Sequence, residues 1–160
     1  MIKLIFKILI IIFGVILQLV LIPILNIKGI YPNIILISVV VLTLMDFTTD
    51  AFLVACFGGI CLDMAGVLPF GLNTLFLIGL IFLIQYLITK YFPQINVLII
   101  IIVTFLSSLL FYLFSSLILK IPLNWLIFLE GIYAILLSLI FFIVLRIFIQ
   151  HSAIVKIEKQ

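Results

Sequence analysis

Two carboxylates in this chain lie within long apolar stretches, where a charge is expensive. Asp63 lies in GGICLDMAGVLPFGLNTL, residues 58–75, and Glu130 follows Trp125 inside another apolar run. A charged side chain at the centre of a bilayer costs about 2.5–3.5 kcal/mol on insertion scales, and less near the surface. We expect Asp63 to brace or cap the turn that follows it, and a direct role in function is the alternative.

Other residue types that carry chemistry are sparse. Cys56 and Cys61 are five residues apart, about 140° out of phase on a helix, which favours two small apolar fillers over a metal or disulfide pair. His151 is the only histidine and lies in the polar tail, so a metal site or triad built on imidazole is not predicted. Asp46 and Asp50 bracket a short polar segment that we interpret as a solvated turn rather than a cation site.

No motif predicts an enzyme. The chain has no GxSxG stretch, no phosphate-cradling glycine pattern and no pair of acids on one helix face. We therefore expect no catalysis, no cofactor and no resident metal. The net charge of +3 lies on the flanks of apolar runs, which suits anionic lipid and gives no indication of nucleic-acid binding.

The composition predicts an all-α, polytopic membrane protein. Of 160 residues, 69% are apolar and 8% are charged, and the mean hydropathy is +1.71. Soluble domains are about half apolar and about a quarter charged, so this chain cannot cover a surface that faces water.

Runs of apolar residues predict one transmembrane domain, residues 1–160, with six spans. The first run is long enough to cross and lacks a small-residue cleavage pattern, so we expect a retained span rather than a signal peptide. Residues 31–65 are ambiguous, because two short spans or one span with a re-entrant piece would both fit, and we favour two. The predicted spans lie near 4–25, 31–45, 51–65, 70–89, 95–119 and 124–149.

The distribution of the basic residues predicts the orientation. With six spans, six of the eight basic residues lie on the side of the two termini and two lie on the other side. The positive-inside rule then places both termini in the cytoplasm. The six are Lys3, Lys7, Lys90, Arg146, Lys156 and Lys159, and the two are Lys28 and Lys120.

A stripe of small residues leads to Asp63. Ala51, Ala55, Gly59 and Asp63 are each four residues apart, which on a helix places them along one side. Small residues at this spacing let another backbone approach closely. Packing within the fold is one interpretation, and a seam for a partner helix or a substrate is the other.

The segment after Asp63 is rich in turn formers. Gly66, Pro69 and Gly71 precede the next apolar run, and we expect them to reverse the chain. Asn73 could cap the start of the following helix.

Glu130 needs a partner if it is charged in the membrane. In the six-span layout, Lys28 and Lys120 lie on the same outer half of the molecule. We predict that Glu130 pairs with one of these lysines, because a bare buried charge is costly.

Amide and hydroxyl side chains also interrupt the apolar runs. Gln18 and Gln85 predict hydrogen bonds between helices. Four residues of the fifth run share one face, where helix packing is expected and a lining for a small polar ligand is the alternative. These are Thr104, Ser108, Tyr112 and Ser115.

Two motifs carry a resemblance to a known family. The first is YPNIILISVVV at residues 31–41, an aromatic-Pro-Asn sequence before a short apolar run. The second is GGICLDMAGVLPFGLNTL, with a Gly-x-x-x-Asp step, a glycine-containing turn and a new apolar helix. With the length and the basic tail, the chain resembles the MreD family of bacterial rod shape-determining membrane proteins. The motif positions are Gly59, Asp63, Gly66 and Gly71.

The resemblance implies a non-catalytic scaffold of the cell-wall elongation machinery in the bacterial cell membrane. Its implied partner is MreC, a single-span protein with a large extracytoplasmic part. An actin-like cytoskeletal protein, a class B penicillin-binding protein and a polytopic glycosyltransferase would complete the assembly. The six-helix layout also resembles substrate-binding components of vitamin transporters, so a small-molecule binding subunit is the alternative.

Overall fold

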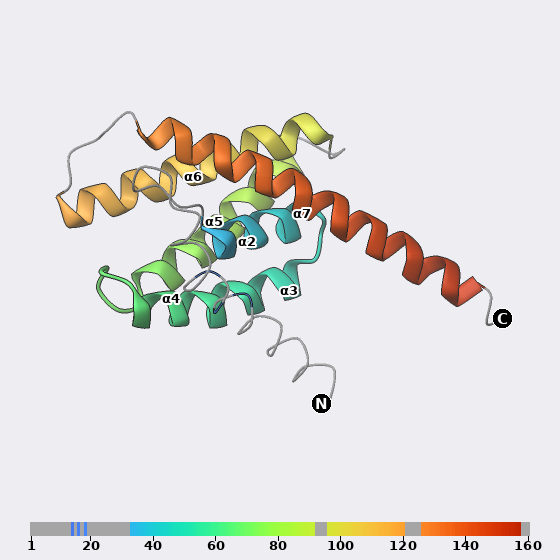
Figure 1. Ribbon diagram of the computed structural model, residues 1–160, viewed down its shortest axis with the longest axis horizontal. Helices are drawn as coiled ribbons and strands as arrows, with labels where there is room; N and C mark the ends of the chain where they lie inside the picture. Colours follow the sequence, from blue (N-terminus) through green and yellow to red (C-terminus); the bar gives the residue numbers. More distant parts are fainter. Residues whose placement is uncertain are drawn as a thin grey trace.

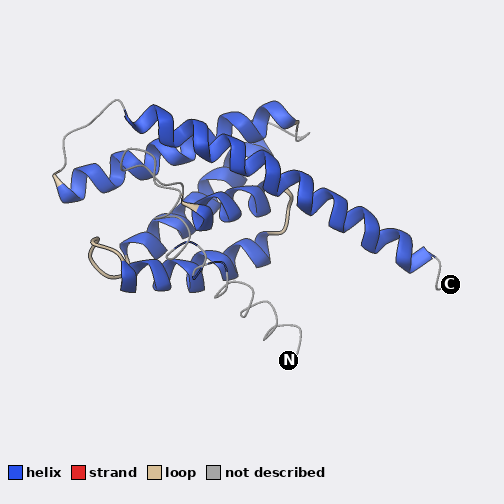
Figure 2. Ribbon diagram, in the orientation of Figure 1, coloured by secondary structure: helices blue, strands red, loops and turns tan. Residues whose placement is uncertain are grey.

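The computed structural model describes residues 33–91, 96–120 and 126–157, together with Gly14, Ile16 and Gln18. These residues form helices and turns without strands (Figure 2). The helices are α2 (Ile34–Leu44), α3 (Thr48–Leu53), the π-helical η1 (Val54–Gly58), α4 (Gly59–Ala65), α5 (Leu72–Tyr91), α6 (Val97–Leu119) and α7 (Leu126–Ile157).

Helix α2 lies at the centre of the bundle (Figure 1). It contacts α3, η1, α5, α6 and α7. Its sequence, IILISVVVLTL, is apolar on every side, which is typical of a helix that has neighbours all round. Its buried residues are Ile35, Leu36, Ile37, Val39, Val40, Val41, Thr43 and Leu44.

Helices α3, η1 and α4 follow one another without a break and form a single 18-residue helix, Thr48–Ala65. A tight turn joins it to α2, with Asp46 in the left-handed region at φ 63°. At its other end, the turn from Gly66 to Gly71 leads into α5.

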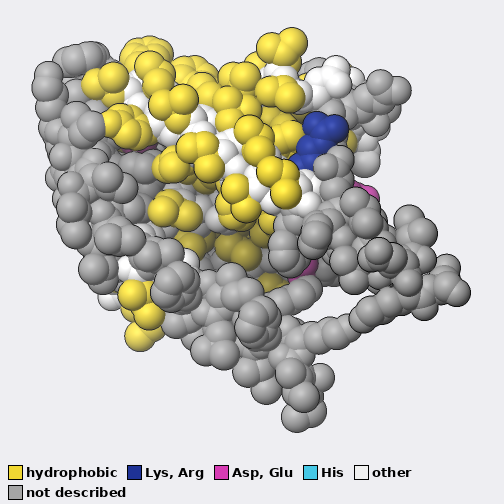
Figure 3. Space-filling model, turned by 45° about the vertical axis from the view of Figure 1, so that its right-hand side comes forward, with side chains coloured by type: hydrophobic (Ala, Val, Ile, Leu, Met, Phe, Trp, Pro, Cys, Tyr) yellow, Lys and Arg dark blue, Asp and Glu magenta, His cyan; other side chains and the backbone are white. Residues whose placement is uncertain are grey.

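Helices α6 and α7 pack against each other and are arranged with their apolar sides outward. On α6, Leu106 and Leu110 are exposed, whereas Thr104, Ser107 and Ser108 are buried. A water-soluble helix has the opposite arrangement, so this one predicts a lipid surround. Figure 3 shows hydrophobic side chains covering most of the described surface on the face that it draws.

The same arrangement holds on α7. Gly131, Ala134 and Ser138 face inward and are buried. Ile132, Leu136 and Ile140, each four residues apart, are exposed. The three buried positions on this side of α7 are therefore small, whereas the side chains that face outward are large and apolar.

The described helices include four that are long and apolar enough to cross a membrane: Thr48–Ala65, Leu72–Tyr91, Val97–Leu119 and Phe128–Ile147. The second predicted span is a helix of 11 residues, α2, about 16 Å long, which is roughly half of the hydrocarbon thickness. Of the first predicted span, residues 4–25, only Gly14, Ile16 and Gln18 are among the described residues.

Candidate functional site

Asp63 is buried near the end of α4 and binds the beginning of α5. Its Oδ1 accepts a hydrogen bond from the Asn73 amide at 2.9 Å. Its Oδ2 accepts one from the Thr74 amide at 3.2 Å and one from the Thr74 hydroxyl at 2.6 Å. The side chain is 5% exposed. We call this group of three residues the Asp63 cap.

The Asp63 cap completes the first turn of α5. The first amides of a helix have no acceptor within it, and an unpaired amide is costly in an apolar medium. Here the Leu72 amide donates to the Pro69 carbonyl and the Leu75 amide to the Gly71 carbonyl, while Asp63 takes the two amides between them. The negative charge of Asp63 also lies at the positive end of the α5 dipole, and this interaction stabilises the charged carboxylate.

Two adjacent glycines let this helix approach its neighbours closely. A Cβ placed on Gly59 would lie 2.7 Å from the Thr74 Cα of α5, and one on Gly58 would lie 2.8 Å from the Ile35 Cγ2 of α2. Neither position has room for a side chain without movement of the neighbour. Gly59 was singled out by the spacing of small residues, and Gly58 was not.

The small stripe faces the interior of the bundle. Ala51 and Ala55 are fully buried, as is Gly59, and Asp63 follows at the same spacing. In a regular α-helix, residues four apart drift by about 40° per step, so three steps would turn Asp63 well away from Ala51. The π turn Val54–Gly58 takes one more residue per turn and removes part of this drift.

The burial of the stripe matches the prediction of packing within the fold. It leaves no free surface for a partner helix along this line, because the stripe residues face α2 and α5.

Gly66 and Gly71 shape the turn between α4 and α5. A Cβ on Gly66 would lie 2.7 Å from the Leu62 carbonyl oxygen, and Gly71 has φ +92°. The suggestion that Asn73 caps the following helix was wrong, because Asn73 is the second residue of α5 and its own amide is capped by Asp63. It is buried beside the carboxylate instead.

A second polar group closes the beginning of α2. The Asn33 side chain accepts a hydrogen bond from the Leu36 amide at 3.1 Å and another from the Gln18 side-chain amide at 3.1 Å. The side-chain Oε1 of Gln18 accepts a hydrogen bond from the Ile35 amide at 3.0 Å. Gln18 thus bonds between segments as predicted, and so does Gln85, which donates to the Thr48 hydroxyl at 3.0 Å.

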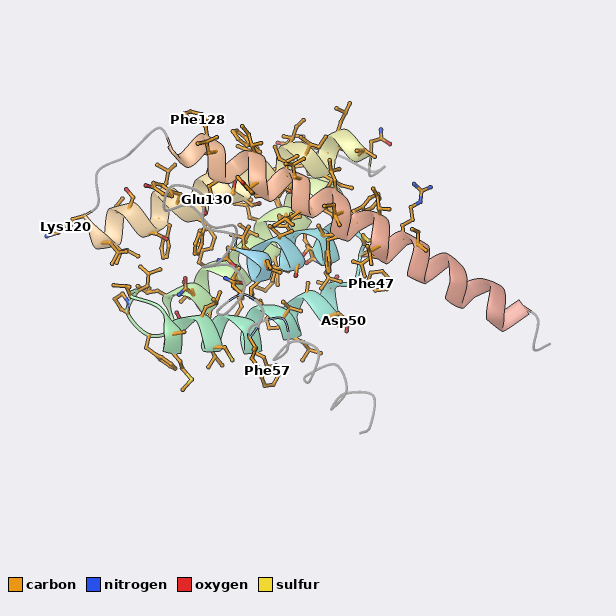
Figure 4. All side chains as sticks on the ribbon, in the orientation of Figure 1. Phe47, Asp50, Phe57, Lys120, Phe128 and Glu130 are labelled. Atoms are coloured by element: carbon orange, nitrogen blue, oxygen red, sulfur yellow. The ribbon has the colours of Figure 1, made fainter. Side chains whose placement is uncertain are left out.

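Glu130 has a different environment from Asp63. It lies in the first part of α7, four residues before the buried Ala134, and it is only partly exposed. No hydrogen bond or ion pair joins it to another described residue. Of the two lysines predicted as its partner, Lys120 does not pair with it, because Lys120 is the exposed cap at the end of α6 and points away from Glu130 (Figure 4). Lys28 lies outside the described residues.

The level of Glu130 in the bundle follows from the packing of α2 on α7. Ile37 and Val41 cluster with Ala134, and the two helices run in the same direction (Figure 1). One turn earlier on each helix, Asn33 and Glu130 therefore lie at a similar level, near the beginning of α2.

The predicted hydroxyl face of α6 is used mainly within the helix and at its contact with α7. Ser108 and Ser115 donate to the carbonyls of Phe105 and Phe111, each at 2.9 Å. Thr104 is fully buried, and its hydroxyl is without a hydrogen-bond partner. These three hydroxyl residues are therefore used within α6 or buried in its packing.

The described residues do not bring together three or more His, Cys, Asp or Glu side chains that could hold a metal ion. Cys56 and Cys61 are both free thiols and partly buried. The arrangement can join helices and hold one carboxylate within the membrane.

Two of the described polar groups that sequence reasoning missed are Asn33 and Thr74. Asn33 carried a signal, because it precedes an apolar run as a helix cap does. Thr74 carried none, since its bond to Asp63 depends on how two helices meet.

In comparisons with known proteins, neither a family model, nor a curated protein, nor a solved structure matches this chain.

Proposed function

We propose that this protein is a non-catalytic membrane scaffold of the bacterial cell-wall elongation machinery, which binds an MreC-like single-span protein. The family resemblance of the two motifs is the basis of the proposal. What supports a scaffold is the use of the intramembrane polar groups, because Asp63, Asn33 and Gln18 join segments of the chain and leave little polar chemistry for a substrate.

The observation that carries the binding role is that Glu130 has no hydrogen-bond or ion-pair partner among the described residues. An acid within a membrane span usually has a partner or a function, and no described side chain binds this one. We propose that it contacts the partner, or a cation that the partner brings. The actin-like protein, the penicillin-binding protein and the glycosyltransferase would join through the same assembly.

The proposed layout is a six-span bundle with both termini in the cytoplasm. Four spans correspond to the long apolar helices of the structure. Helix α2 and the first apolar run, near 4–25, would supply the other two, with α2 reaching only part of the way across.

Co-purification tests the partnership. The full-length chain is expressed with a tagged MreC-like protein from the same genome, extracted in mild detergent and captured on the tag. We expect stoichiometric capture of the wild-type chain and a several-fold loss for Glu130→Gln, with both proteins monodisperse. Lys120→Gln is the matched control, because Lys120 is exposed at a helix end and should not alter capture.

Two results would contradict the proposal. If the wild-type chain is not captured, the partnership is wrong. If Glu130→Gln is captured as well as wild type, the partnership stands and Glu130 has no part in it. Deletion in a rod-shaped host should also give rounded cells.

A vitamin-type binding subunit is the second candidate. It is favoured by α2, because short helices that begin within a bundle are common around the binding sites of transporters. A ligand at saturating concentration should then raise the melting temperature of the purified chain, and the scaffold predicts no such ligand.

A further inference from the structure

The turn between α4 and α5 exposes large apolar side chains beyond the ends of both helices. Val67 is 85% exposed and Phe70 is 71% exposed. Met64, at the end of α4, is 76% exposed. The turn itself, residues 66–71, contains no charged residue.

The turn at the opposite end of the same helix is different. It contains the exposed Asp46, and Asp50 follows in the first turn of α3, so that residues 46–50 read DFTTD. Between Ala51 and Thr89 the only charged residue is Asp63, which is buried. The end of the helix near Asp46 therefore carries charges that suit an aqueous boundary, and the end at the turn Gly66–Gly71 carries none.

Helix length places the apolar turn close to the hydrocarbon. Thr48–Ala65 has 18 residues and is about 27 Å long, which is less than the roughly 30 Å of the hydrocarbon core. If the acidic turn remains at the aqueous boundary, the helix ends before it reaches the opposite headgroups. By contrast, α6 has 23 residues, about 34 Å, and ends at the charged Lys120.

The apolar turn also continues the outward-facing surface of the helices that it joins. Ile60 and Met64 are exposed one turn apart on α4, and Leu75 is exposed in the first turn of α5. Side chains at the boundary between acyl chains and headgroups can bury apolar area there.

Backbone hydrogen bonds at the ends of the turn lower the cost of placing it close to the hydrocarbon. Several backbone groups at its ends are already paired: the Gly66 amide donates to the Leu62 carbonyl at 2.7 Å, and the Leu72 amide to the Pro69 carbonyl at 3.2 Å. The Asp63 cap satisfies the next two amides of α5. Fewer donors are therefore left to seek water.

We propose that the turn Gly66–Gly71 is an interfacial lipid anchor, which inserts Val67 and Phe70 into the leaflet at its end of the bundle. The occupant of this apolar surface is lipid at the boundary between headgroups and acyl chains. The proposal does not depend on the partner of the protein.

Fluorescence quenching in vesicles tests the depth of the turn. The chain has one tryptophan, so Trp125→Phe provides the background, and Phe70→Trp places a single indole in the turn. The full-length protein is reconstituted into vesicles of phosphatidylcholine and phosphatidylglycerol. Bromine is carried near the top or near the end of the acyl chains, and iodide is the aqueous quencher.

We expect lipids brominated near the top of the chain to remove about half or more of the emission from position 70, with little effect of iodide. Phe82→Trp, at an exposed position well inside α5, should be quenched best by the deeper bromines. Tyr91→Trp, at the end of α5, should be quenched more by iodide than position 70 is. Val67→Trp is a second reporter if Phe70→Trp folds poorly.

The proposal is overturned if iodide reaches the indole freely and brominated lipids leave its emission unchanged. It is also overturned if the indole is shielded only after a partner protein is added, because the occupant is then a protein.

Discussion

Asp63 and Glu130 are both acids within helices that are apolar enough to cross a membrane, and their surroundings differ. Asp63 accepts three hydrogen bonds from two residues of α5 and is almost completely buried. Glu130 is partly exposed and has no bonding partner among the described residues.

The difference indicates that Asp63 serves the stability of the fold, and we propose that Glu130 serves binding. The carboxylate of Asp63 accepts two amides in the first turn of α5 that would otherwise need water as their acceptor, so the fold depends on it. The carboxylate of Glu130 contributes no bond to the described fold, so the reason to keep it lies in what it binds. The hydrogen-bond partners of an acid in a membrane span must therefore be identified before the acid is interpreted as a functional site.

The largest effect is expected for Asp63→Ala. It removes three hydrogen bonds and leaves two amides at the start of α5 unpaired, which should lower the free energy of unfolding by about 2–4 kcal/mol. Unfolding of the purified protein in mixed detergent micelles measures this change.

A double-mutant cycle with Thr74→Val sharpens the result. The hydroxyl of Thr74 is the shortest contact of the carboxylate, so the two substitutions should be less than additive. Strict additivity would mean that Asp63 stabilises the fold by another route.

A smaller loss is expected for Gly59→Ala. The new methyl group would lie 2.7 Å from the Thr74 backbone, which must move away, and overpacking of this kind costs about 1–3 kcal/mol. Gly79→Ala in α5 is the matched control, because a Cβ there meets nothing within 4 Å. Its stability should be unchanged or slightly raised, since alanine favours helix. Equal losses at both positions would argue against a close contact at Gly59.

Gln18→Leu should have a more modest effect. It removes two hydrogen bonds at the beginning of α2 and leaves the Ile35 amide without its acceptor, for a loss of about 1–2 kcal/mol. Gln85→Leu removes one bond of a less buried side chain and should cost less. The reverse order in thermal unfolding would contradict the central position of α2.

Much of the fold could be predicted from local pattern. Long apolar runs indicated the spans that became α5, α6 and α7, and glycine and proline marked the turn after Asp63. The spacing of Ala51, Ala55 and Gly59 indicated a close helix contact, and these residues are buried in one.

The rest depended on contacts between distant segments. The amide acceptors of α5 come from Asp63, ten residues earlier, and the cap of α2 includes Gln18 from the first apolar run. The π turn that aligns Asp63 with the stripe has no residue signature of its own. The sequence marked the run that became α2 as short, but whether it crosses the membrane was left open, because an apolar run does not reveal whether lipid or protein surrounds it.

Substituting each acid by its isosteric amide tests the central comparison most directly. Asp63→Asn and Glu130→Gln each remove one charge with little change of shape, and both proteins are unfolded side by side in the same micelles. We predict a clear loss of stability for Asp63→Asn, because an amide cannot accept all three hydrogen bonds, and none within error for Glu130→Gln. A loss at Glu130 that equals or exceeds the loss at Asp63 would contradict this account.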